Sequence, residues 1–130
     1  MTTAEALMVL LHRGWAPFVA ESQVRFRAPA GDRSAPQAAD ALAVLREHRE
    51  EAGALLAWPT ECIESAARFG HLDARLYPML GATVDTPAGP ARLLRVLSGR
   101  AEIHRPGEAR TEIIPAAEIR PPQGGVARAV

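Results

Sequence analysis

Two arginines stand two positions apart in a short stretch that alternates between apolar and charged residues, Val24 to Arg27. In a β-strand, residues two apart lie on the same face, so Arg25 and Arg27 would project together while the apolar residues face a core. Guanidinium groups bind carboxylates through paired hydrogen bonds, and an edge strand offers backbone hydrogen bonds to an extended peptide. The pattern favours a binding surface for an acidic peptide, to which we add Phe18. Arginines on an exposed strand also occur without any function, and the sequence leaves both interpretations open.

A second group of arginines lies in the last third of the chain. Residues 92–110 contain five arginines and two glutamates, a local excess of three positive charges. Such a cluster can contact the phosphates of a nucleic acid. No Phe, Trp or Tyr follows Tyr77, so base stacking and aromatic grooves for proline-rich peptides lack their essential part. The candidate nucleic-acid contacts are Arg92, Arg95, Arg100 and Arg105.

No set of residues for catalysis or metal binding stands out in the sequence. Cys62 is the only cysteine, and the four histidines lack the spacing of zinc sites. The serines lie outside a nucleophile-elbow motif, and a chain without lysine cannot form a phosphate-binding P-loop. The glutamates at 50–51 and 61–64 are expected to be solvated on helix faces. We therefore expect a protein that is not an enzyme and binds no metal or other cofactor.

Composition limits the class of protein further. The chain has 130 residues, which is enough for one compact domain or two very small ones. It is 48% hydrophobic and 23% charged, with 15 basic and 15 acidic residues, which favours a globular protein over a disordered one or a uniformly basic nucleic-acid coat. All basic residues are arginine, a coding bias that weakens arginine as a sign of phosphate binding. The single cysteine, the lack of a leader and the lack of a long apolar run predict a cytoplasmic protein outside the membrane.

The first part of the chain is expected to form a helix followed by a hairpin. Thr2 and Glu5 have the spacing of a capping box, and the apolar residues that follow recur with helical spacing over 3–13. Two short apolar stretches, at 18–20 and 24–28, flank a polar connection and predict the hairpin.

A second helix is expected from Ala35 to about Glu47, behind an S-x-x-Q capping signature that begins at Ser34. Apolar residues continue to Leu56. Either one long helix reaches that residue, or the helix breaks near His48 and a third one follows. The sequence does not decide between the two.

A similarity to a known family is carried by Gly14-Trp15-Ala16-Pro17-Phe18, Val24-Arg25-Phe26-Arg27-Ala28-Pro29-Ala30-Gly31 and Leu45-Arg46-Glu47-His48-Arg49-Glu50-Glu51. With these segments, the order of elements resembles the TubC-type N-terminal docking domain of hybrid peptide and polyketide synthetases, over about residues 3–57. Members of that family are small αββαα homodimers whose hairpin captures the C-terminal tail of an upstream subunit. The resemblance implies a protein-binding hairpin and a homodimer formed by residues 1–58. No condensation-domain motif follows, so we do not expect the front of a synthetase.

The rest of the chain changes in character. Residues 59–80 predict a helical connector that Thr60 caps and Gly70 ends. Residues 81–120 contain short apolar stretches with Gly/Pro turn signals about every ten residues, which indicates a small all-β unit similar to SH3-like or KOW-like barrels. Residues 121–130, rich in Pro, Gly and Ala, are expected to be a loose tail. Strands are expected near 83–85, 92–97, 101–104, 111–114 and at Ile119.

The sequence as a whole thus predicts an α+β protein with an N-terminal αββαα docking-like module, a short helical connector and a C-terminal small SH3-like β-barrel. The leading hypothesis is a non-enzymatic adaptor that binds a partner protein through its hairpin. The alternative is a nucleic-acid-associated accessory protein, for instance of a mobile element or phage, whose barrel arginines contact the phosphate backbone.

Overall fold

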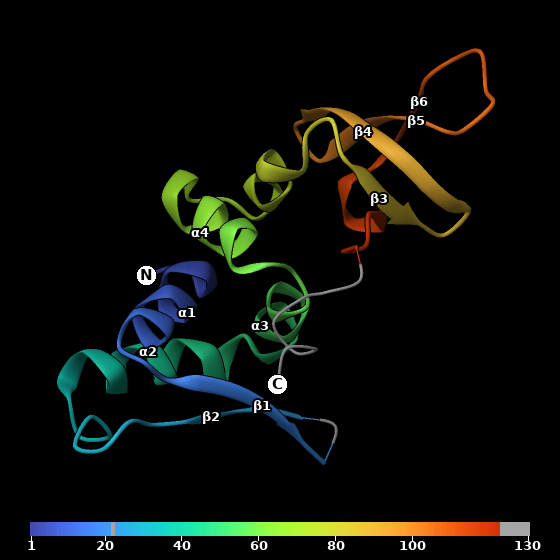
Figure 1. Ribbon diagram of the computed structural model, residues 1–130. Coiled ribbons are helices and arrows are strands. Elements are labelled where there is room, and N and C mark those ends of the chain that lie inside the picture. The colour runs from blue at the N-terminus through green and yellow to red at the C-terminus, as the bar shows by residue number, and fades with distance from the viewer. Residues whose placement is uncertain (22, 123–130) are drawn as a thin grey trace.

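Two groups of elements, joined by a helical segment, make up the protein (Figure 1). The computed structural model describes residues 1–21 and 23–122. In the first group, three helices lie beside a two-stranded hairpin, and the second is a four-stranded antiparallel sheet. The described residues include no helix long and apolar enough to cross a membrane. Most of the expected loose tail, from residue 123 on, lies outside the described residues.

The first group follows the predicted order of elements. It consists of α1 (Thr3–His12), β1 (Ala16–Ala20), β2 (Gln23–Arg27), α2 (Pro36–Glu47) and α3 (Arg49–Leu56). The capping box is confirmed, because the Glu5 amide donates to the Thr2 hydroxyl over 3.1 Å and the Thr2 amide donates to the Glu5 carboxylate over 3.0 Å. These bonds satisfy amides that the first turn of a helix otherwise leaves unpaired.

The hairpin is antiparallel, and its register places Pro17 opposite Phe26 and Phe18 opposite Arg25. Val24 and Phe26 pack against the first core, as their alternation predicts. Glu21, in the turn, has a φ of 53°, the left-handed conformation for which glycine is the usual residue. The hairpin therefore forms although its turn lacks the glycine.

The stretch from residue 35 to 56 forms two helices, which resolves the open alternative. His48 lies between them with φ −127° and ψ 48°, outside the helical range. The predicted Ser34 cap is wrong: α2 starts behind Ala35 without a side-chain cap. Pro36 takes the first helical position, where its missing N–H and fixed φ are compatible with a helix start.

The expected connector is part of both hydrophobic cores. It consists of α4 (Thr60–Phe69) and the 3₁₀ helix η1 (Leu72–Met79). The predicted Thr60 cap is wrong, because Pro59 is the N-cap residue of α4. The sequence did not predict η1. The left-handed Gly70 between them confirms the predicted stop. Ile63 of α4 belongs to the core of the first group, whereas Cys62 belongs to the core under the sheet. One helix thus serves as a wall for both cores.

The second group is a meander of four strands in the order β3–β4–β5–β6. A bulge interrupts the pairing of β4 with β5 between Leu93 and Arg95. Because the bulge adds one residue to β4, Arg92 and Arg95 lie on the same face of the sheet although they are three positions apart. The short 3₁₀ helix η2 (Ala116–Glu118) follows the last strand. The strands are β3 (Thr83–Thr86), β4 (Gly89–Leu97), β5 (Arg100–His104) and β6 (Glu112–Pro115).

The barrel expected over 81–120 does not close in the described part of the chain. Where a fifth strand was expected at Ile119, the backbone makes a single bridge, between Asp85 and Arg120. Pro121 and Pro122 follow directly. Since proline has no N–H, these residues cannot continue a ladder along β3. The sheet is therefore open.

Candidate protein-binding site

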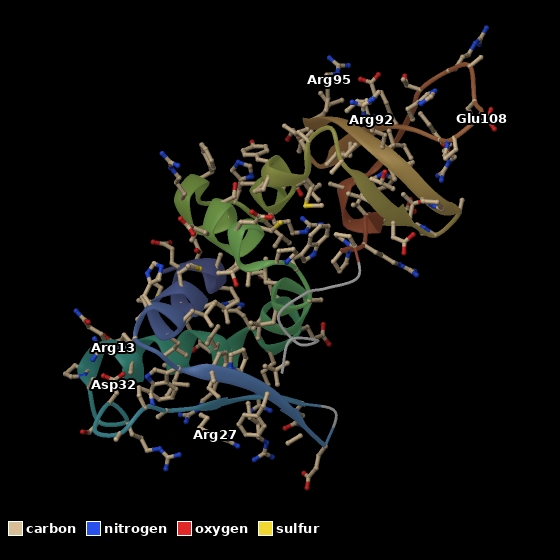
Figure 2. The ribbon with its side chains drawn as sticks, in the orientation of Figure 1. Arg13, Arg27, Asp32, Arg92, Arg95 and Glu108 are labelled. Atoms are coloured by element: carbon tan, nitrogen blue, oxygen red, sulfur yellow. The ribbon has the colours of Figure 1, made fainter. Side chains whose placement is uncertain are left out.

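The three residues predicted for partner binding gather on the outer face of the hairpin. Phe18 and Arg25 are direct cross-strand neighbours, and Arg27 lies two positions further along β2. The guanidinium carbon of Arg27 stands 5.5 Å from the centre of the Phe18 ring, a cation–π contact that orders both side chains. Figure 2 shows Arg27 on the side of the hairpin that is turned away from the helices.

Arg25 has only a weak ionic partner. Its Nη2 lies 3.8 Å from Glu21 Oε2, and the side chains are 53% and 88% exposed. An exposed pair at this distance contributes little and is screened by salt. The charge of Arg25 therefore stays available to a ligand.

A groove of about 780 Å³ runs along the edge of β2 that faces away from β1, between the strand and the helices α2 and α3. The lining is partly apolar and includes Val24 and Phe26 from the strand. It contains Gly53 of α3, where a Cβ atom would lie 4.0 Å from Val24 Cγ2. The remaining lining residues are Gln23, Leu42, Leu45, Ala52 and Ala54, with the charged side chains Arg25, Arg46, Arg49 and Glu50.

Arg46 and Arg49 were missed as site residues at the sequence level. They belong to the charged run around His48, which reads as a solvated helix face. Only the break at His48 and the packing of α2 and α3 beside β2 bring them to the same groove as Arg25. Their three-residue spacing, which favours one side of a helical path, was the available signal.

A polar cluster holds the hairpin against the helices. The Arg13 guanidinium, at the end of α1, binds both carboxylate oxygens of Asp32 and also donates to Gln37 Oε1 over 2.9 Å. Trp15 Nε1 donates to the same carboxylate over 2.6 Å. Arg13 first, and Trp15 second, lower the pKa of Asp32. Because Arg13 and Trp15 precede β1 and Asp32 lies in the loop between β2 and α2, the cluster joins the start of the hairpin to its end (Figure 2).

The arginines predicted for nucleic-acid contact do not form one surface. Arg92, Arg95 and Arg100 share the outer face of the sheet, because Arg92 pairs with His104 and Arg95 with Glu102, and both of these partners lie on the same face of β5 as Arg100. Arg95 Nε donates to Glu102 over 2.6 Å, and Arg95 and Thr111 together lower the pKa of Glu102. Part of the positive charge on this face is therefore neutralised.

Arg105 lies apart from the other three. Its Nε binds Glu112 over 2.8 Å and its Nη1 donates to Thr86 Oγ1 over 2.9 Å. Thr86 is buried, and so is Ile103, the cross-strand partner of Glu112. Arg105 therefore makes its contacts on the inner side of the sheet. The predicted four-arginine patch is thus divided, because strand alternation and the ladder were not visible in the spacing alone.

One buried arginine, Arg75 in η1, was not predicted at all. It donates to the carbonyls of Leu72 and Ala116, each over 3.1 Å, and lies 5.4 Å from the Trp58 ring centre. Burial lowers its pKa, and Asp73, at 3.7 Å, acts in the opposite direction. These contacts join η1 to the segment between α3 and α4 and to the start of η2, so the side chain has a structural role.

The chemistry of a nucleophile or a metal has little support among the described residues. Cys62 is fully buried, and burial raises the pKa of its thiol to about 11, which keeps it protonated at neutral pH. No group of three His, Cys, Asp or Glu side chains in the described part of the chain is placed to hold a metal ion.

Comparison with known proteins adds no name to this geometry. No known protein family, curated protein or solved structure matches the chain. The resemblance of residues 3–57 to TubC-type docking domains therefore remains a hypothesis from the sequence.

Proposed function

We propose that this protein is a non-enzymatic adaptor that captures the extended, acidic tail of a partner protein at its hairpin. The observation that carries the proposal is the groove along β2, where a strand edge without a neighbour among the described residues adjoins apolar side chains and three arginines. Extended peptides bind such edges by adding a strand, and pockets for alternate side chains give specificity.

The chemistry of the groove supports an acidic and aliphatic ligand. Arg25, Arg46 and Arg49 outnumber the single acid, Glu50, in the lining. A peptide paired with β2 would turn every second side chain inward, toward Val24 and Phe26, and the others outward. An alternation of aliphatic and acidic residues fits both sides.

The nucleic-acid hypothesis has less support. Two of its four arginines, Arg95 and Arg105, are engaged by glutamates, and Arg105 lies off the common face. Phosphate binding depends on cations that can replace the counterions of the nucleic acid. Only Arg92 and Arg100 of the predicted set have no carboxylate partner within 4 Å among the described residues.

Two finer expectations belong to the same proposal. An open SH3-like topology for residues 83–120 is supported by the return of the chain, through η2, to the first strand of the sheet. A homodimer formed by residues 1–58, which the resemblance implies, has little support, because a second chain is not needed to cover the core of that segment. Ile63 and Ala66 of α4 join that core within one chain.

The test uses a short synthetic peptide that alternates glutamate and leucine, labelled for fluorescence anisotropy. Reversing Arg25→Glu and Arg27→Glu together should weaken its binding by about tenfold or more, since attraction becomes repulsion at an exposed strand. The matched control is Arg92→Glu with Arg100→Glu, which changes the net charge equally on the other sheet and should leave the affinity unchanged. Circular dichroism confirms that both variants fold.

Two results would contradict the proposal. One is equal affinity of the hairpin variant and the wild type for the peptide. The other is binding of a labelled DNA or RNA duplex that falls steeply with salt and is lost in the sheet variant instead, which would favour the nucleic-acid hypothesis.

A further inference from the structure

Both β3 and β6 are edge strands of the sheet in the described part of the chain, but only β3 is partly covered. On the β3 side, the backbone of Arg120 donates to Asp85 over 2.8 Å and accepts from it over 3.3 Å. On the other side, β6 pairs with β5 and with no further strand in the described part of the chain. An open edge is a template for pairing with another strand.

The direction of the backbone groups on β6 follows from one hydrogen bond. The amide of Ala116 donates to Gly99 over 3.0 Å, so Ala116 points its N–H toward β5. Since antiparallel residues alternate, Ile114 and Glu112 also point inward, and Ile113 and Pro115 point outward. Proline at an outward position loses no bond within the sheet. Ile113 therefore offers both its N–H and its C=O to a neighbour.

The side chains at this edge are apolar or already neutralised. Ile113 is 53% exposed and is the only large apolar side chain of the described sheet strands with that exposure. Its cross-strand neighbour Glu102 is bound by Arg95 and Thr111, and Glu112 is bound by Arg105. Charged residues normally protect such an edge from pairing. Here ion pairs within the chain offset those charges.

We propose that β6 pairs antiparallel with β6 of a second copy of the chain, centred on Ile113. This register places Ile113 beside the partner's Ile113, so the two residues exchange both hydrogen bonds and cover each other's exposed side chains. The contact is symmetric, as a closed dimer requires. Since each sheet has four strands, pairing would produce one continuous sheet across both copies.

The short strand and its proline set the strength of the contact. β6 has four residues, Glu112–Pro115, and the carbonyl opposite Pro115 receives no N–H. Such an interface is far smaller than the roughly 1,200 Å² at which stable interfaces begin. The dimer is therefore weak and forms with rising concentration. It leaves the hairpin groove free, so its failure would not affect the proposed function.

Sedimentation velocity of the full chain over a wide concentration range tests the pairing. The wild type should shift from the monomer mass of 13.9 kDa toward twice that value. Ile113→Lys, which adds like charges across the symmetry axis, should stay monomeric. The matched control is Leu80→Lys: Leu80 is 47% exposed outside the sheet, and this variant should associate like the wild type.

A second variant tests the backbone. Ile113→Pro removes the outward N–H and the isoleucine side chain but no hydrogen bond within the sheet, which edge strands tolerate, so it should fold and remain monomeric. A wild type that stays monomeric at every concentration overturns the proposal. So does a dimer that persists in Ile113→Lys. Should Ile113→Pro fail to fold, the lysine variant alone decides.

Discussion

The hairpin and the four-stranded sheet both carry arginines on an exposed face, yet the two sheets use them differently. On the hairpin, Arg27 stacks on Phe18, and Arg25 has only a long contact to an exposed glutamate. On the larger sheet, Arg95 is held by a cross-strand glutamate and Arg105 by another. The same residue type is thus available to a ligand in the hairpin, whereas glutamates engage two of the four predicted arginines of the larger sheet.

The free edges of the two sheets differ in the same way. The edge of β2 adjoins a groove with Arg46 and Arg49, which suits an acidic ligand. The edge of β6 carries exposed Ile113 beside neutralised glutamates, which suits a second copy. Local ion pairing, rather than the number of arginines, decides what each edge can bind.

A different arginine holds each of the two regions against the helices. Arg13 ties the hairpin through a partly exposed pair, whereas Arg75 is 6% exposed and joins the sheet to the helices. Arg75→Ala would remove two hydrogen bonds from a charged donor, to the carbonyls of Leu72 and Ala116, each worth about 1.5–3 kcal/mol. We expect a loss of roughly 2–4 kcal/mol in the free energy of unfolding, measured by urea denaturation.

This variant also tests whether the two regions unfold together. Trp15 lies in the first core and Trp58 in the second, so variants that retain one tryptophan report each region. Because α4 belongs to both cores, the two signals should have one common transition.

The matched control for Arg75→Ala is Arg68→Ala, an exposed position on α4 that should change the free energy of unfolding by less than about 0.5 kcal/mol. A loss as small as the control would remove the assigned role of Arg75.

Acid denaturation should distinguish the carboxylates that each region depends on. The folded-state pKa of Asp32 lies below its ordinary value because of Arg13 and Trp15, and that of Glu102 is lowered by Arg95 and Thr111. A lowered folded pKa means stability that is present above the unfolded pKa, near 4, and lost as pH falls through the folded pKa.

The difference in stability between the wild type and Asp32→Asn should therefore be largest at neutral pH and vanish in strong acid. Glu102→Gln should behave in the same way with a smaller difference, because the Arg95 that binds it is largely exposed. Thermal melting between about pH 2 and 7 measures both. A difference that is constant with pH would contradict the ion-pair explanation.

The smallest expected effect is at Gly53, on the floor of the groove. In Gly53→Ala the new methyl group would lie 4.0 Å from Val24 Cγ2, an ordinary contact. Replacing a glycine within a helix by alanine should stabilise the chain by about 0.5–1 kcal/mol. A thermal melt measures this gain. The counterpart is Gly70→Ala. Gly70 has a positive φ of 76°, which alanine adopts only with strain, so this change should destabilise the chain.

Local patterns in the sequence were enough for most of the elements. The Thr2 cap, the stop at Gly70 and four strands of the meander depend on neighbours within a few residues, and the structure confirms them. The Ser34 cap failed because Pro36 offered another start for the same helix. The 3₁₀ helix η1 was missed, since its residues have no regular apolar period.

The sequence by itself determined the alternation that places Arg25 and Arg27 on one face, because strand periodicity is a property of adjacent residues, whereas the hairpin register adds Phe18 to that face. Only the tertiary structure decided that Arg46 and Arg49 join them at a groove, that glutamates engage Arg95 and Arg105, and that the barrel stays open. Each of these outcomes depends on which distant residues meet. The spacing of residues along a chain does not contain the register of strands or the packing of helices, and these two determine which charges remain free.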